Sequence, residues 1–244
     1  MKVSHFLYKV KLYLFSKRTY TYLLKHPLSA FKFGVRILIS QDDYLSFVSN
    51  LLDEPKDVIM KLMPGDDSMS DLISAFRASI APSSGETGVS FEECLSLYLI
   101  CRSLKPKYVV ETGVSAGRST TCILRALHDN NKGELYSIDP DQNSGYAIPE
   151  HLKVRWRFIN ATSEESLPGL LEKLKYIDIF LHDSLHTYEN MFFEYQTAWP
   201  YIRKGGVLLS DDVDRNSAFQ DFVKSVNAKA VYLSKSFAGT RKCL

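Results

Sequence analysis

Cysteine is scarce in this sequence of 244 residues, and its four copies form neither a CxxC pair nor a metal-binding spacing. Cys94 and Cys101 share one face of a helical pattern, which predicts reduced thiols that face the core. No uncharged run approaches the ~20 apolar residues of a membrane span, and basic residues interrupt the first apolar stretch, so no signal peptide is indicated. The GxGxxG motif is also missing, which disfavours a nicotinamide-dependent dehydrogenase. These absences favour a cytoplasmic protein.

Acidic residues are absent from residues 1–41, which contain eight Lys or Arg interleaved with aromatic residues. The remainder has 22 bases and 28 acids, so the net charge of +2 conceals an asymmetry. Such an arm can lie on an anionic membrane surface, where its rings set the depth and its bases supply the attraction. It can equally contact an acidic partner or a second subunit, or simply cover the core, and nucleic acid is a less favoured alternative. We expect peripheral membrane contact or homo-oligomer contact through residues 1–41, within a basic, aromatic-rich helical extension over residues 1–60.

Helical patterns also occupy the region that follows this arm. Residues 42–63 read as a helix interrupted at a proline, and residues 70–80 read as a short amphipathic helix. The stretches MPGDDS and APSSGETG, which flank the second of these helices, are typical of loops. Ser90 and Glu93 form a capping box that predicts a helix ending near Leu104.

Strand-like and helix-like segments alternate regularly through the rest of the chain. Such alternation requires a mostly parallel sheet that is covered by helices on both faces, and the final GTRKCL is expected to add an antiparallel edge strand. We therefore predict an α/β fold for residues 61–244: a Rossmann-like, doubly wound, mostly parallel seven-stranded sheet. The strand-like segments are 108–112, 134–139, 154–160, 177–183, 206–212 and 230–234. The helix-like segments are about 117–128, 163–174, 187–203 and 216–227, with a less regular one at 146–152.

The first two strands end in residues that suit a nucleoside-containing cofactor. Gly113 and Gly117 lie in the turn of VVETGVSAGRST, where glycine allows the backbone to approach a ligand closely and the following helix offers its N–H groups. Asp139 ends the second strand, where an acid can accept both hydroxyls of a ribose, although it also suits a plain turn. Thr162, between Ala161 and Ser163 after the third strand, lies where an adenine could bind, and Ser163 can instead cap the next helix.

The fourth and fifth strands end in acids. Asp183 ends the fourth strand, and Asp211–Asp212 end the fifth strand, which begins after a turn at RKGG. Neighbouring parallel strands should therefore bring three carboxylates together. Their mutual repulsion would raise the pKa of at least one, and a hard divalent cation such as Mg2+ would remove the conflict. His186, whose pKa lies near working pH, suits a general base. A helix cap at Asp183 and a surface or core role for His186 remain alternatives.

Taken together, these residues resemble a class I S-adenosylmethionine-dependent methyltransferase. VVETGVSAGRST resembles the first motif of that family and LYSID its ribose-binding acid. HDSLHTYENMFFEYQTAWPYIRKGGVLLSDDV resembles the macrocin-O-methyltransferase and cephalosporin-hydroxylase-like group, methyltransferase family 24. The resemblance covers residues 86–244. It implies metal ligation by Asp183, Asp211 and Asp212, a base at His186, and a cofactor site lined by Glu111, Gly113, Ser115, Gly117 and Asp139.

Two departures from the family pattern bear on substrate and cofactor. SLHTY lacks the lysine that catechol-type relatives carry near the fourth-strand acid, so a catechol acceptor is disfavoured. NATSEE lacks the conventional acid near the adenine, which weakens the assignment of Thr162 to the adenine site. The resemblance implies an S-adenosylmethionine-dependent, metal-assisted O-methyltransferase acting on a hydroxyl of a small molecule such as a sugar or glycolipid intermediate. Hydroxylase-like chemistry on the same fold and a non-catalytic docking module are the alternatives.

Overall fold

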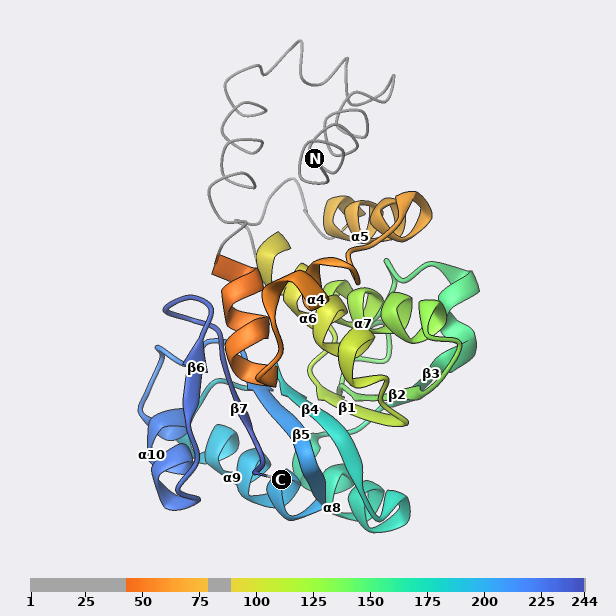
Figure 1. Cartoon of the computed structure of the whole chain (residues 1–244). Helices are drawn as coiled ribbons and strands as arrows, with labels where there is room; N and C mark the ends of the chain where they lie inside the picture. The colour runs from red at the N-terminus through yellow and green to blue at the C-terminus, as the bar shows by residue number, and fades with distance from the viewer. Residues whose placement is uncertain (1–42, 79–88, 244) are drawn as a thin grey trace, which may run out of the picture.

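A computed structural model of the chain describes residues 43–78 and 89–243 (Figure 1). The basic arm at 1–41 and the predicted loop at 81–88 lie outside the described residues, so the predictions made for them stay predictions. Residues 43–52 are helical, and Tyr44, Phe47 and Val48 of this helix are buried in the same core as the sheet. Part of the predicted extension therefore packs on the main fold, and the division at residue 60 stays a prediction.

The sheet has seven strands in the order β3-β2-β1-β4-β5-β7-β6, which confirms the predicted Rossmann-like fold. The first five strands pair in parallel, and β7 runs antiparallel to both of its neighbours. Because these five strands run in the same direction, their carboxyl ends lie along one edge of the sheet. The strands are β1 (Tyr108–Thr112), β2 (Glu134–Ile138), β3 (Trp156–Ile159), β4 (Ile177–His182), β5 (Ile202–Ser210), β6 (Ala230–Tyr232) and β7 (Ala238–Arg241).

Helices cover both faces of this sheet, and each face has its own apolar core. Successive strand residues point to opposite faces, so Val109 packs with one set of helices and Val110 with the other. The first set, beside residues 43–52, is α4 (Lys56–Met60), α5 (Asp66–Ala78), α6 (Phe91–Leu104) and α7 (Arg118–Asp129). The second set is α8 (Ser163–Leu174), α9 (Tyr188–Ala198) and α10 (Ala218–Ser225). Two 3-10 turns, η1 (Glu150–Arg155) and η2 (Trp199–Tyr201), precede β3 and β5.

The capping box at the start of α6 is confirmed. The Ser90 hydroxyl accepts a hydrogen bond from the Glu93 amide, and the Glu93 carboxylate accepts one from the Ser90 amide. The helix ends at Leu104, as predicted, because Lys105 adopts a left-handed conformation. Cys94 and Cys101 on this helix are both buried free thiols, as predicted.

Two predictions around β5 are wrong. The helix predicted over 187–203 ends at Ala198, because a 3-10 turn through Pro200 leads into β5 at Ile202. The RKGG stretch is not a turn before the strand but lies within it, where the pairing with β4 shifts register between Ile177 and Ile179. Gly205, with φ +77°, provides the left-handed residue that such a bulge favours.

The predicted antiparallel strand near the carboxyl terminus exists, but it is not at the edge of the sheet. β7 inserts between β5 and β6, pairing Leu208 with Thr240 and Val231 with Gly239. When a two-stranded hairpin joins the edge of a sheet, only one of its strands pairs with the sheet and the other becomes the new edge. Here β7 pairs with β5, and the earlier strand, β6, is the edge. The sequence shows both segments as strands but does not show which of them reaches β5.

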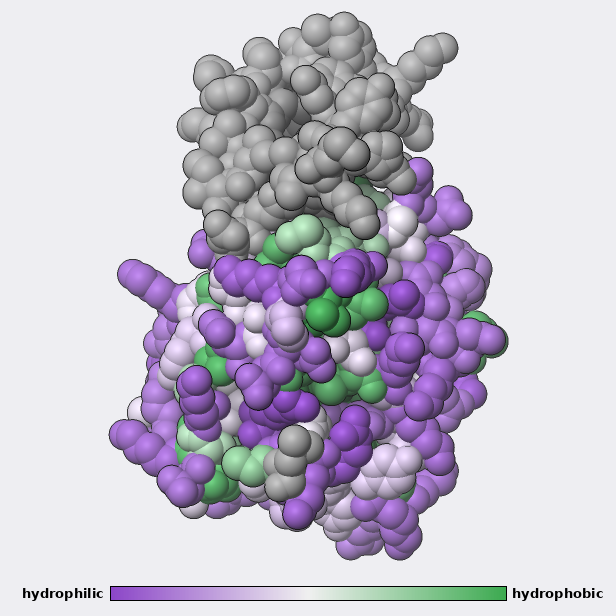
Figure 2. All heavy atoms as spheres, in the orientation of Figure 1, coloured by the Kyte–Doolittle hydropathy of each residue, from purple (hydrophilic) through white to green (hydrophobic). Residues whose placement is uncertain are grey.

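The face of the molecule seen in Figure 1 is mostly hydrophilic in Figure 2, with apolar side chains gathered near α4, whose Val58 and Met60 are partly exposed. Within the two described stretches, no helix has both the length and the apolar character needed to cross a membrane.

Candidate active site

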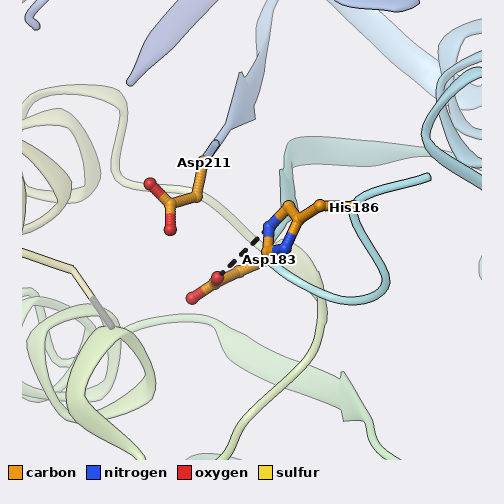
Figure 3. Close-up of side chains that lie close together, drawn as sticks. All are labelled: Asp183, His186 and Asp211. Atoms are coloured by element: carbon orange, nitrogen blue, oxygen red, sulfur yellow. Dashed lines mark ion pairs between the residues drawn. The ribbon is translucent and has the colours of Figure 1, made fainter. Parts of the chain in front are cut away.

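Three side chains that could hold a metal ion meet where β4 and β5 end. Asp183 and Asp211 follow these two strands and His186 lies in the loop after β4, with one ligand atom of each within 4.8 Å of the others. The strand register dictates this meeting, because His182 pairs with Ser210 and the Asp211 amide donates to the His182 carbonyl at 3.0 Å. Figure 3 shows the two carboxylates and the imidazole gathered around one region.

The electrostatics of this cluster favour a bound cation. Burial raises the pKa of Asp183 well above its usual range, and the neighbouring carboxyls of Asp211 and Glu111 raise it further. Burial also raises the pKa of Asp211, with Asp212 adding to the effect. Two adjacent carboxyl groups that are hard to ionise become easy to ionise around a divalent cation. The two carboxylates suit Mg2+ or Mn2+, whereas an imidazole ligand would favour a softer metal such as Fe2+ or Zn2+.

The His186 ring lies between the carboxylates of Asp183 and Asp212. Its Nε2 is 3.9 Å from Asp183 Oδ1, and its Nδ1 is 3.5 Å from Asp212 Oδ2. Burial lowers the pKa of His186, and the nearby His182 ring lowers it further. The Nε2 atom is buried and has no hydrogen-bond partner among the residues that the structure describes. A neutral imidazole with a free nitrogen can accept a proton or bind a metal.

Asp212 stands apart from the cluster of three. Its carboxylate faces His186 and also pairs with Arg215 at 3.2 Å, while Asp183 and Asp211 face each other. Asp212 has a left-handed backbone, with φ +51°, which turns it away from the direction of the preceding strand. In this arrangement Asp212 is placed to orient the imidazole, and its metal ligation stays a prediction.

The glycine turn after β1 lies directly against the β4 loop. Gly113 has φ +83°, and a Cβ added to it would lie 1.9 Å from the Asp183 carbonyl oxygen. Gly117 has φ +95° and caps α7, where an added Cβ would lie 2.5 Å from Ile148. Both positions therefore require glycine. The turn that should bind a cofactor and the loop that carries Asp183 are in backbone contact.

Asp139 supports this turn from the end of β2. One oxygen of its carboxylate accepts hydrogen bonds from the amides of Val114 at 2.8 Å and Ser115 at 3.1 Å, and the other accepts the Asp141 amide at 2.8 Å. Because a carboxylate can accept about four hydrogen bonds, roughly one position is left for a ligand hydroxyl. Asp139 thus fixes the shape of the turn and retains capacity for a ribose.

Glu111, the acid inside the same motif, is fully enclosed. Its carboxyl accepts hydrogen bonds from the hydroxyls of Ser119, Thr120 and Ser137 at 2.6 to 2.8 Å. Burial raises its pKa to about 7, although these three hydrogen bonds act in the opposite direction. Glu111 holds the first turn of α7 through its hydrogen bonds with Ser119 and Thr120. Its direct contact with a cofactor stays a prediction.

Thr162, not Ser163, caps α8. The Thr162 hydroxyl accepts the Glu165 amide at 3.4 Å and the Glu165 carboxylate accepts the Thr162 amide at 3.1 Å, which completes a capping box. The prediction that Ser163 is the cap is wrong by one residue, because Ser163 already lies within the helix. The hydroxyl of Thr162 is engaged in this cap, and its role beside an adenine stays a prediction.

The sequence predicts no role in the site for His182 or Glu194, and only a helix-capping role for Glu93. His182 and Glu194 form a fully buried pair, with Nδ1 and Oε2 2.7 Å apart. Glu93 of α6 is buried near Asp211, and burial, with the Asp211 charge, raises its pKa to about 7. A signal for His182 exists in the sequence, since it is a titratable residue that directly follows the apolar run IFL at the end of a strand. Glu194 is indistinguishable from an ordinary residue of an amphipathic helix.

Comparison with known families identifies the central part of the chain. Residues 110–213 match the model of a family described as "Methyltransferase domain". This match runs from β1 to the residues just after Asp212, and so includes the glycine turn, Asp139 and the acidic cluster. A search among curated proteins finds no match to this chain.

Several solved structures with similar folds are described as O-methyltransferases. An O-methyltransferase TomG from Streptomyces achromogenes, involved in tomaymycin synthesis and solved with SAM, matches with a TM-score of 0.55 and 15% identity over 75% of this chain and 92% of its own. An O-methyltransferase from Bacillus cereus in complex with SAH gives 0.54 and 18% over 74% and 93%. A putative O-methyltransferase from Klebsiella pneumoniae gives 0.53 and 20% over 77% and 94%. At these identities the likeness establishes the fold.

Proposed function

We propose that this chain, whose residues 110–213 match a methyltransferase-domain model, is an S-adenosylmethionine-dependent methyltransferase that transfers a methyl group to a hydroxyl of a small molecule with the help of a divalent cation. The favoured acceptor is a sugar or a glycolipid intermediate. The similar folds solved with SAM or SAH support the cofactor, and the cluster of Asp183, His186 and Asp211 supports the cation.

One observation carries this proposal: the glycine turn and the acidic cluster adjoin. Gly113 approaches the Asp183 carbonyl so closely that no side chain fits between them, and the Asp183 amide donates to the Thr112 carbonyl at 2.8 Å. A methyl donor bound at the turn would therefore be next to an acceptor hydroxyl bound at the cluster. Methyl transfer from a sulfonium is an in-line displacement, so most of its catalysis comes from such positioning.

The residues of the cluster would prepare the acceptor for this displacement. Asp183 and Asp211 would hold the cation, with Asp212 as the third proposed ligand. A bound Mg2+ lowers the pKa of a coordinated hydroxyl. His186, whose pKa is lowered by burial and then by His182, would receive the hydroxyl proton on its free Nε2, while Asp212 orients the ring through Nδ1. The displaced product of the donor would be S-adenosylhomocysteine.

The geometry gives His186 a second candidate role as a metal ligand, since one of its ring nitrogens belongs to the group of three ligand atoms. The two roles differ in a measurable way. A ligand contributes to the affinity for the metal, whereas a base contributes to turnover alone. Titration of the His186→Ala variant with Mn2+ separates them: unchanged Mn2+ affinity supports the base, and a loss of tenfold or more supports the ligand.

The experiment that tests the proposal is calorimetry and thermal shift with S-adenosylmethionine, S-adenosylhomocysteine and NAD, each with Mg2+ and with EDTA. We expect the two sulfur nucleosides to bind and NAD not to bind. A ligand at 100 times its Kd should stabilise the fold by about 2.7 kcal/mol. Incubation with methyl-labelled S-adenosylmethionine and a panel of sugars and glycolipids then identifies the acceptor. Binding of NAD alone, or of none of the three, would contradict the proposal.

Contacts through residues 1–41 belong to the same proposal. A basic, aromatic arm would hold the enzyme against an anionic membrane, close to a lipid-linked acceptor. Sedimentation with anionic and neutral vesicles tests this, with gel filtration of the same sample to detect a homo-oligomer. Binding to anionic vesicles that 0.5 M salt does not reduce would argue against an electrostatic contact.

A further inference from the structure

A buried, charged residue outside the proposed mechanism lies beneath the active-site loop. Glu194 of α9 is fully buried, yet its carboxylate accepts short hydrogen bonds from neighbouring polar groups. Burial acts to raise the pKa of Glu194, but its hydrogen bond and electrostatic interaction with His182, together with hydrogen bonds from Ser163 and Thr112, bring this pKa below its usual range. A buried carboxylate that stays ionised is costly unless its partners are fixed. The hydrogen bonds that keep this carboxylate ionised therefore also restrain the side chains that form them.

The partners of Glu194 flank Asp183 on both sides. The ring of His182 lies 2.7 Å from Oε2, and the hydroxyl of Ser184 donates to Oε1 at 2.7 Å. Asn190, one turn earlier on α9, donates to Glu194 at 3.2 Å and to the Leu185 carbonyl at 2.9 Å. The segment from residue 182 to residue 185 is thus held at three points: the side chains of His182 and Ser184 and the carbonyl of Leu185.

Glu194 also reaches the turn that should bind the cofactor. The Thr112 hydroxyl donates to Oε2 at 2.5 Å, and Thr112 is the residue that precedes Gly113. One carboxylate therefore joins the end of β1 to the end of β4. Replacing it would loosen the contact between the two halves of the proposed site without removing any residue that meets a ligand.

The position of the His186 ring depends on the same carboxylate through His182. The rings of His182 and His186 meet edge to face, with centroids 5.3 Å apart and an interplanar angle of 85°. The other side of the His182 ring packs on Tyr195 at 5.5 Å. With one nitrogen of His182 bound to Glu194, the ring cannot rotate, and it limits where His186 can lie.

We infer that Glu194 is a positioning residue: its carboxylate, acting through His182, Ser184 and Thr112, sets the geometry of Asp183 and His186. The inference rests on the proposed function of the same site. Hydrogen-bond partners of metal-binding groups typically contribute about 10- to 100-fold to metal affinity, and that is the size of effect expected here.

The test compares Glu194→Gln with Asp178→Asn in the full-length chain. Gln keeps the size of Glu, and its oxygen can still accept from His182 and Thr112, but the NH2 group that replaces the other oxygen cannot accept from Ser184 and Asn190. Asp178 is a matched control, because it is a buried acid on the same strand as His182, at its opposite end, and accepts from Lys107, Tyr108 and Arg203. Both variants should lose stability. Only Glu194→Gln should weaken Mn2+ binding by about 10- to 100-fold, while its affinity for S-adenosylhomocysteine changes less than about fivefold.

A second measurement keeps the inference testable if the wild type binds no Mn2+, which would instead count against the metal in the proposed function. Nitrogen-15 spectra of histidine-labelled protein report the His182 and His186 rings, assigned with His182→Asn and His186→Asn. We expect both ring signals to shift in Glu194→Gln and to stay in place in Asp178→Asn. Unchanged ring signals in Glu194→Gln, or equal losses of Mn2+ affinity in the two variants, would overturn the inference.

Discussion

At the scale of single residues, the enclosed carboxyl of Glu111 has the clearest consequence for pH dependence. Burial raises its pKa to about 7 in the folded chain, whereas an unfolded Glu ionises near 4.3. Between these two pH values the folded state retains a proton that the unfolded state has lost. The free energy of unfolding therefore falls as pH rises through this window, and Glu111 contributes no further pH dependence above it.

The Glu111→Gln variant should lack this contribution. From about pH 4.5 to pH 7 we expect its free energy of unfolding to fall less than that of the wild type, by roughly 3 kcal/mol in total at 1.36 kcal/mol per pH unit. Urea unfolding at half-unit pH steps measures the difference. Glu172→Gln, an exposed change on α8, is the control and should follow the wild type. Parallel pH profiles for wild type and Glu111→Gln would show that Glu111 ionises alike in both states.

His186 is the residue on which the chemistry should depend. Once an acceptor is known, His186→Ala should lower turnover by about 10²- to 10⁴-fold, because no other group would take the hydroxyl proton. Its Kd for S-adenosylmethionine should stay within about threefold. His151→Ala, a change of an exposed histidine in η1 that pairs with Asp71 of α5, is the control for general effects. Full turnover in His186→Ala would remove the base assignment.

At the scale of elements, the β1–α7 turn shows how a backbone position can be set by a neighbouring loop. Gly113 has φ +83° and no room for a Cβ beside the Asp183 carbonyl. Gly113→Ala should lower the free energy of unfolding by about 2 kcal/mol or more, from left-handed strain and the need to separate β1 from the β4 loop. It should also abolish cofactor binding.

Gly169→Ala is the matched control for this change. Gly169 lies within α8, and nothing is within 4 Å of the Cβ that alanine would add. Because alanine favours helix over glycine, this variant should gain about 0.5 to 1 kcal/mol. Chemical denaturation and calorimetry on the two variants measure both effects. Equal stabilities would mean that the turn tolerates a side chain and that β1 and the β4 loop are not in fixed contact.

The elements that carry the site are also those that the sequence predicts best. Apolar runs that end in Glu111-Thr112, Asp139 and Asp183 mark the carboxyl ends of parallel strands, and parallel strands share that edge. What the sequence could not supply is the register within a strand or the choice between hairpin partners. The bulge in β5 and the insertion of β7 both depend on backbone pairing between distant segments. Strands that are buried on both faces are apolar on both faces, so their side-chain pattern does not distinguish one pairing from another.

The same limit applies within the site. The two-residue period of a strand places His182 on the same face of the sheet as Phe180, but only the docking of α9 on that face brings Glu194 to it. Likewise, the sequence does not show which of the two adjacent aspartates, Asp211 or Asp212, joins the cluster. The left-handed backbone of Asp212 separates them, placing one in the cluster and turning the other to His186 and Arg215.

At the scale of the whole molecule, the helical residues 43–52 are part of the sheet's core. Phe47 packs edge to face on Phe237, with ring centroids 5.9 Å apart, and Arg241 donates to the Leu52 carbonyl. Gly239 of β7 allows this approach, since its added Cβ would lie 3.3 Å from Leu51. Segments almost two hundred residues apart in sequence therefore form one unit.

Removing this contact should destabilise the entire domain. Phe47→Ala should lower the free energy of unfolding by about 3 to 5 kcal/mol, as for other buried aromatic residues. Val154→Ala, at a position 70% exposed, should change it by less than about 0.5 kcal/mol. Urea unfolding followed by both fluorescence and circular dichroism measures the loss. A cost below 1 kcal/mol for Phe47→Ala would show that the helix folds independently of the sheet.

The place of β7 between β5 and β6 dictates an order of events during synthesis. While the ribosome is still short of Arg241, β5 has no partner on one side, and β6, although already made, has nothing to pair with. The nascent chain thus presents the open edge of its longest strand, which is the kind of surface that invites pairing with another chain. Completion of the sheet must wait for the last strand to emerge, which makes that interval the one in which a chaperone would matter most.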